Sequence, residues 1–203
     1  MDIVERIKES IEVRERELKQ IAPQLNGEII PGDFSFSNLR IGSAGKLPNL
    51  KGIYNNHKIF ISFSNVYDLV DWYTGLIHPR LEIDIYKSCP FIINISHREK
   101  TAFVETLVSL HLEPKGLLIG MIDFDEHYLV ECKENEGSAK EFLIQSGVID
   151  NIRTFGDFSS LIFNKKMIKL IFPPDGPKQY LSGNLLNYVY ILSSLAESVN
   201  SST

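Results

Sequence analysis

The stretch GIYNNHKIFISFS, residues 52–64, decides the fold class, because it predicts two strands joined by a tight turn. Asn55 and Asn56 separate two runs that are rich in β-branched and aromatic residues, a pattern typical of a two-residue hairpin. The strands of a hairpin run antiparallel. We therefore expect an antiparallel sheet, to which the neighbouring segments add strands or covering helices.

Three further stretches predict strands. In LEIDIYK, residues 81–87, apolar and acidic residues alternate, as expected of a strand with one buried face. PFIINIS, residues 90–96, predicts another strand. SSLIFNKKMIKLIFPP, residues 159–174, predicts a second hairpin that turns at residues 164–166. NVYDLVDWYTG, residues 65–75, fits either a helix capped by Asn65 or a strand.

Residues 1–26 predict an N-terminal helix. Pro23 is expected to kink or end this helix, and Arg14 interrupts its apolar stripe. Two readings remain open: the helix lies on its own domain, or it forms a short coiled coil with a second copy. The stripe consists of Ile3, Ile7, Ile11, Leu18, Ile21 and Leu25.

Other helices are expected at residues 97–112, at residues 138–155 with a break near Gly147, and at the C-terminus. The strands and helices come in blocks, which favours an α+β fold: a mainly antiparallel sheet with an N-terminal helix, a middle helical segment and a long C-terminal helix packed on it. Residues 27–203 are expected to form a single α+β domain. The stripe of the last helix is Leu181, Leu185, Val189, Leu192, Ala196 and Val199.

Composition excludes some classes of protein. The 203 residues are 43% hydrophobic and 23% charged, and the formal net charge is -5, which argues against general nucleic-acid binding. Cys89 and Cys132 form no C-x-x-C pair, and no apolar signal segment opens the chain, so we expect a reducing, cytoplasmic setting. The uncharged residues 180–196 fit a core helix better than a membrane span. No cofactor is predicted.

The stretch IGMIDFDEHYLV, residues 119–130, concentrates ionisable groups. If residues 121–133 form one strand, Asp123, Asp125 and His127 share the solvent face, and only Glu126 interrupts the apolar face. The alternative is a metal site, because carboxylates two residues apart on a strand can share one hard cation. Asp123, Asp125 and His127 are thus the catalytic and metal-ligating candidates, although no metal is expected.

The same stretch resembles a segment found in a group of bacterial proteins with no assigned function. In that group a Gly-Asp-x-x-Phe-Asp segment leads into a strand, a helix and a short hairpin. Gly120, Phe124 and Asp125 match this pattern, whereas Met121 replaces its first aspartate. The resemblance covers residues 47–175 and implies an α+β domain without implying an activity.

A second candidate site is basic. Residues 34–67 contain no acid and include Arg40, Lys46, Lys51 and Lys58, so a fold that gathers these four side chains could bind a phosphate or an acidic partner. The segment GSAGK within it is not a Walker loop, because Leu47 follows where a Ser or Thr is required.

Two hypotheses about function follow. The first is a non-enzymatic binding or assembly module of a bacterial cytoplasm, with a protein partner or self-association as a homodimer. The alternative is a metal-dependent hydrolase, in which Asp123 and Asp125 hold the ion and His127 is a ligand or a base. An exposed apolar patch on the first or last helix favours the first hypothesis.

Overall fold

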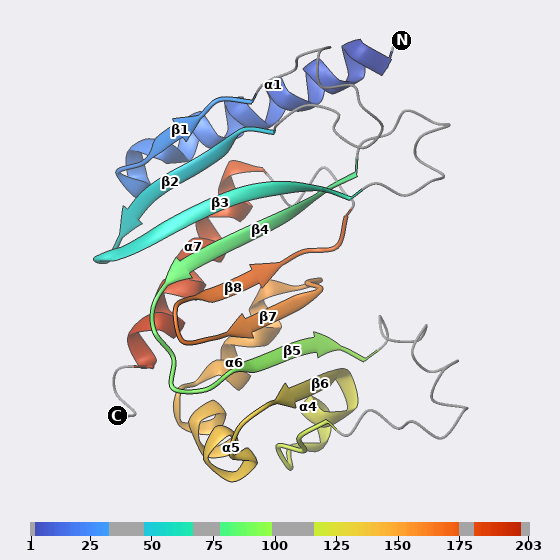
Figure 1. Ribbon diagram of the computed structural model, residues 1–203, viewed down its shortest axis with the longest axis vertical. Helices are drawn as coiled ribbons and strands as arrows, with labels where there is room; N and C mark the ends of the chain where they lie inside the picture. The colour runs from blue at the N-terminus through green and yellow to red at the C-terminus, as the bar shows by residue number, and fades with distance from the viewer. Residues whose placement is uncertain (1–2, 33–46, 67–77, 99–115, 175–180, 200–203) are drawn as a thin grey trace. The chain divides into compact units, whose positions relative to one another are not determined.

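The computed structural model describes residues 3–32, 47–66, 78–98, 116–174 and 181–199, and it confirms the α+β class. Eight strands form an antiparallel sheet, with helices at the start, in the middle and at the end of the chain (Figure 1). The chain divides into two compact units. The first contains Met1–Asp84 and Phe172–Val189, and the second contains Ile85–Ile171 and Tyr190–Thr203. The predicted boundary at residue 26 stays a prediction.

The first unit contains the predicted N-terminal helix and hairpin. Helix α1 is followed directly by a 3-10 turn at Ala22–Leu25, which contains Pro23. The strands of this unit lie in the order β1-β2-β3-β4. The elements are α1 (Ile3–Ile21), β1 (Glu28–Ile30), β2 (Asn49–Tyr54), β3 (His57–Val66) and β4 (His78–Tyr86).

The turn between β2 and β3 confirms the predicted hairpin. Asn55 and Asn56 have φ angles of 47° and 62°, and Tyr54 pairs with His57 across the turn. Asparagine accepts this left-handed backbone more readily than other non-glycine residues. Strand β3 continues to Val66, so the reading in which Asn65 begins a helix is wrong. Residues 67–75 lie outside the described residues.

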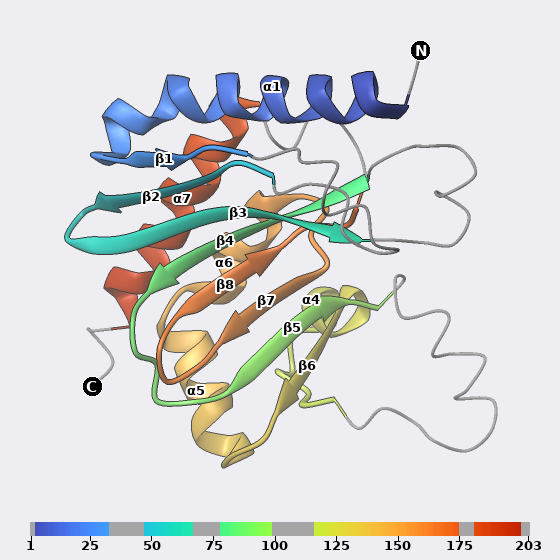
Figure 2. The same ribbon diagram turned by 45° about the horizontal axis from the view of Figure 1, so that its top comes forward.

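Helix α1 packs within its own unit, as one of the two readings of its stripe expects. It runs alongside β1 and β2 (Figures 1 and 2), and Leu18 and Ile21 are fully buried. Arg14 is also buried, and its guanidinium carbon lies 5.4 Å from the centroid of the Phe63 ring. The ring accommodates the charge by a cation–π contact, which explains why arginine is tolerated within the apolar stripe.

The second unit contains the remaining strands and the middle helices. Its strands lie in the order β8-β7-β5-β6. The prediction that a helix begins at residue 97 is wrong, because His97 is the last residue of β5; residues 99–112 lie outside the described residues. The elements are β5 (Ile93–His97), α4 (Ile122–His127), β6 (Tyr128–Cys132), α5 (Glu136–Gln145), α6 (Val148–Ile152), β7 (Ser160–Phe163) and β8 (Ile168–Ile171).

Local signals explain where these elements begin and end. Asn135 caps α5, since its side-chain oxygen accepts from the backbone N–H of Ser138 at 3.3 Å. Gly147, with a φ of 67°, separates α5 from α6 as predicted. The turn between β7 and β8 is held by Asn164, whose Oδ1 accepts from the backbone N–H groups of Lys166 and Met167 at 2.8 and 2.9 Å.

Helices α5 and α6 lie on one face of the strands of the second unit (Figure 2), and the core lies between them. The other face carries polar groups, such as Asn94, which donates to the Glu131 carboxylate at 2.9 Å. Helix α7 (Ser182–Ser198) begins in the first unit and ends in the second. Of its predicted stripe only Leu181 is exposed. Within the described residues, no helix combines the length and the apolar character that a membrane span needs.

Candidate functional site

The acid-rich segment is a helix, not the strand that its alternation predicts. Residues 122–127 form α4, and the strand β6 begins only at Tyr128. The carbonyl oxygen of Met121 accepts from the backbone N–H groups of Phe124 and Asp125, at 2.9 and 2.8 Å, which closes the first turn of α4. Gly120, with a φ of 86°, supplies the left-handed backbone that leads into this turn.

The Asp125 carboxylate holds this turn together. Its Oδ1 accepts from the backbone N–H of Ile119 at 2.9 Å, and its Oδ2 accepts from the N–H of Gly120 at 2.7 Å. Arg98 braces the other end of α4, because its Nε donates to the carbonyl oxygens of Asp125 and Tyr128 at 2.6 and 3.2 Å. These groups account for the helix: the local alternation favours a strand, but the carboxylate and the guanidinium bind the backbone of a turn.

The other two members of the proposed catalytic set point elsewhere. The Asp123 side chain is 81% exposed and lies 3.8 Å from Arg153 Nη2, and His127 Nδ1 lies 2.8 Å from the Asp123 carbonyl oxygen. Residues two apart on a helix are about 200° apart around its axis, so Asp123 and Asp125 do not lie on one face, as they would on a strand. In the described part of the chain, no group of three or more His, Cys, Asp or Glu side chains could hold a metal ion. The catalytic and metal-binding roles stay predictions.

The helical turn places apolar side chains in solvent. Leu118 is 61% exposed, Met121 44% and Ile122 76%, whereas Phe124 is fully buried against Tyr128, with ring centroids 4.9 Å apart. On a strand Ile122 and Phe124 would share the buried face, but on a helix they lie on nearly opposite sides. We call Leu118, Met121 and Ile122 the corner patch.

A hollow of about 530 Å³ adjoins the corner patch. Acidic and basic groups lie together at this hollow, since Asp123 and Asp150 line it with Arg153. The residues that line it lie at the start of α4, in α6 and directly after α6: Gly120, Met121, Ile122, Asp123, Ile149, Asp150 and Arg153.

The segment before α4 covers the side chain of Leu129, a residue that would share a face with the acids if residues 121–133 formed one strand. Leu129 is buried, and a Cβ atom at Gly116 would lie only 2.4 Å from its Cδ1. The backbone N–H of Leu117 donates to the carbonyl oxygen of Val130 at 2.7 Å, so residues 116–117 run against β6. A Cβ atom at position 116 would force the end of the Leu129 side chain to move, so a glycine suits this close approach.

The sequence contains a signal that could have revealed the helical turn at residues 120–127. Gly120 precedes an aspartate by five positions, a spacing at which the side chain can accept from the backbone of the turn that the glycine begins. Glu126, the one misfit in the strand reading, has a simple position on α4, where it is exposed. The strand prediction misses the corner patch because it places Ile122 on a buried face.

The basic candidates are only partly described. Arg40 and Lys46 lie outside the described residues. Lys51 on β2 pairs with Phe60, and Lys58 on β3 pairs with Ile53, so the two lysines share one face of the hairpin at diagonal positions. Glu28 on β1 is in register with Lys51, which places an acid beside the expected anion site. Anion binding stays a prediction.

The two cysteines do not form a disulfide. Cys89 is buried, and burial raises the pKa of its thiol to about 12, although the nearby charge of Lys87 acts in the opposite direction. A thiol with such a pKa is protonated at neutral pH and is a poor nucleophile. Cys89 is thus a packed core residue in this structure.

Comparison with other proteins supports the fold alone. No protein-family model matches the chain, and the search of curated proteins gives no match. A solved structure with a similar fold is the crystal structure of the mycobacterial trehalose monomycolate transport factor A, TtfA, with a TM-score of 0.56 and 9% sequence identity over 92% of this chain and 94% of that chain. At this identity the likeness says nothing about activity or ligand.

Proposed function

We propose that this protein is a non-enzymatic binding module that docks a protein partner on the corner patch. The observation that carries the proposal is the exposure of Leu118, Met121 and Ile122 within five positions of one another, beside a hollow. Single apolar side chains are common on protein surfaces, but a group of large ones at a hollow is typical of a contact surface. The nearby Asp125 carboxylate meanwhile supports the turn that displays the patch.

Binding of a partner would bury apolar side chains of the corner patch that are exposed in the free chain. Complete burial of a large aliphatic side chain is worth about 1.5–3 kcal/mol, and Ile122 leaves most of that gain unrealised in the free chain. The turn is fixed at its start by Asp125 and at its end by Arg98. A partner therefore meets a preorganised surface, which lowers the entropic cost of binding.

Charge complementarity defines the partner. Two carboxylates, Asp123 and Asp150, and one guanidinium, Arg153, line the hollow, and Arg153 lies near Asp123. Among the residues that line the hollow, the carboxylates outnumber the cations by one, and the Lys140 ammonium lies close to Gly120 at its margin. The expected occupant is a protein segment that presents a bulky apolar side chain to the patch and a lysine or arginine to the acids.

A peptide library displayed on phage and selected on the full chain tests this proposal. We expect enriched peptides to combine an aromatic or large aliphatic residue with a neighbouring lysine or arginine. The variant Ile122→Glu should weaken their binding at least about tenfold, because it puts a charge into the apolar contact. The matched control is Ile144→Glu, which changes another exposed isoleucine, on α5, and should leave binding unchanged.

Three results would contradict the proposal: no enrichment, peptides without the apolar and basic pair, or equal binding by Ile122→Glu and the parent chain. Sedimentation equilibrium tests the alternative that the patch binds a second copy of the chain. A dimer that dissociates in Ile122→Glu but not in Ile144→Glu would show that the patch binds a second copy. The proposal of a different protein as the partner would then be wrong.

The setting inferred from the sequence belongs to the same proposal. Free cysteines at positions 89 and 132 support a reducing, cytoplasmic compartment, and the resemblance around Gly120 supports a bacterial origin. TtfA is a transport factor, a role that is compatible with a module that binds and does not catalyse. Fractionation of cells that express a tagged chain tests the compartment.

A further inference from the structure

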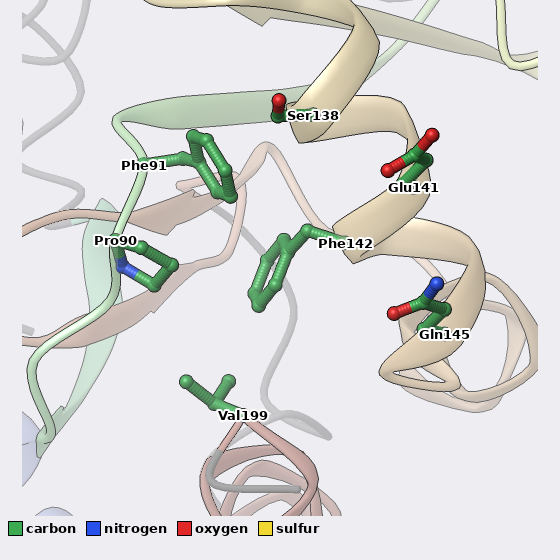
Figure 3. A pocket seen from close by; sticks show the side chains of 7 residues that line it. All are labelled: Pro90, Phe91, Ser138, Glu141, Phe142, Gln145 and Val199. Carbon is green, nitrogen blue, oxygen red and sulfur yellow. The ribbon is translucent and has the colours of Figure 1, made fainter. Parts of the chain in front are cut away.

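A second hollow, of about 240 Å³, lies in the second unit between α5 and the residues that precede β5. Four of its lining residues occupy positions i, i+3, i+4 and i+7 of α5 and so lie on one face of that helix. The hollow is lined by Pro90, Phe91, Ser138, Glu141, Phe142, Gln145 and Val199 (Figure 3).

Two aromatic rings form the apolar part of this hollow. The centroids of Phe91 and Phe142 lie 5.5 Å apart with an angle of 51° between the rings. Phe142 is 4% exposed and is held from behind by Phe163, whose ring centroid lies 5.9 Å away. The Phe142 ring is therefore fixed by the core, and the half-exposed Phe91 ring lies against it.

The margin of the hollow is polar and carries one charge. Ser138, Glu141 and Gln145 are exposed along α5 (Figure 3). Among the residues that line the hollow, Glu141 has the only side chain that is ionised at neutral pH. A carboxylate beside two aromatic rings provides both a counter-charge and π faces, the two groups that attract an organic cation.

We propose that this hollow binds a small organic cation, namely an amine with a short apolar body. The rings of Phe91 and Phe142 contact the body and the cation, and Glu141 neutralises the charge. The volume is below the usual range of about 300–1,000 Å³ for drug-sized ligands, so the ligand must be small. Glu141 repels anions, and a single carboxylate does not hold a metal ion firmly.

The test is an NMR titration of the full chain with three probes of similar size: 2-phenylethylamine, the neutral 2-phenylethanol and the anion phenylacetate. We expect the amine to shift the backbone amides of α5 saturably and to bind at least about tenfold more tightly than the alcohol, which corresponds to the loss of one charge contact. Phenylacetate should not bind.

Variants at an exposed position test the role of the charge without disturbing the fold. Glu141→Gln keeps the shape of the side chain and should remove the preference for amine over alcohol, and Glu141→Lys should reverse the preference in favour of phenylacetate. Glu136→Gln, on the first turn of the same helix and outside the hollow, is the matched control and should retain the preference.

Equal affinity for amine and alcohol in the parent chain would overturn the proposal, as would the absence of saturable shifts or an equal effect of Glu136→Gln. The site is independent of the corner patch. Ile122→Glu should therefore leave amine binding intact, and failure of either proposal can be recognised separately.

Discussion

Removal of the Asp125 carboxylate should open the α4 corner. In Asp125→Ala the backbone N–H groups of Ile119 and Gly120 lose acceptors at 2.9 and 2.7 Å. A hydrogen bond to a charged group contributes about 1.5–3 kcal/mol. Because Asp125 is half-buried and the N–H of Gly120 is exposed, water recovers part of this energy, and we expect a net loss of about 2–3 kcal/mol.

Amide hydrogen exchange measures this loss where it occurs. A change of 1.4 kcal/mol is a factor of ten, so the amides of Ile119 and Gly120 should exchange about 30- to 140-fold faster in Asp125→Ala, if they exchange by local opening. Asp125→Asn keeps one acceptor oxygen and should show an intermediate effect. The control is Asp123→Asn, whose side chain is 81% exposed and whose ion pair with Arg153 should contribute little.

Equal acceleration of these two amides in Asp125→Ala and Asp123→Asn would refute the role of the carboxylate, as would no acceleration in either variant. Both results would mean that something else holds the turn. A uniform acceleration across the second unit would instead show that the corner opens only when the whole unit unfolds.

Three further outcomes are expected. Phe124→Ala removes a fully buried ring and should lower the free energy of unfolding by about 3–5 kcal/mol in urea denaturation, and a loss below about 1 kcal/mol would mean that the ring is not in the core. Asn56→Gly should stabilise the hairpin by about 0.5–1 kcal/mol and Asn56→Val should destabilise it, since the φ of 62° suits glycine; the reverse order of melting temperatures would refute the turn geometry. In Cys132→Ser the remaining thiol, Cys89, should stay unmodified by iodoacetamide at pH 9 until urea is added, because its pKa of about 12 keeps it protonated; rapid labelling of the native chain would contradict its burial.

Several elements could be predicted because their signals are local. The Asn55-Asn56 turn, the capped turn at Asn164 and the break at Gly147 each need particular backbone angles or side-chain acceptors that neighbouring residues supply. The stripes of α1 and α7 likewise repeat at the helical period. Where the burial of their side chains is described, all of them except Leu181 are buried, so these faces follow from spacing.

The candidate sites could not be predicted in the same way. Short apolar alternation over residues 121–133 fits a strand, and nothing in that pattern shows that Arg98, 27 residues away, binds the carbonyl oxygen of Asp125. The hollow with Phe91 and Glu141 also joins residues that are remote in sequence. Apolar periodicity distinguishes a helix from a strand only over several turns, and the six residues of α4 are too few for that distinction.

The amino-acid sequence by itself determined the α+β class, the two hairpins and the buried stripes, because turns and periodicity depend on residues that are close along the chain. Only the tertiary structure decided that the acids occupy a helical turn, that Asp125 binds backbone N–H groups and that Ile122 faces solvent. The physical reason is that buried backbone groups need hydrogen-bond partners, and packing can supply these from residues that are remote in sequence. At α4 the partner is Arg98, just after β5, which donates to the carbonyl oxygens of Asp125 and Tyr128.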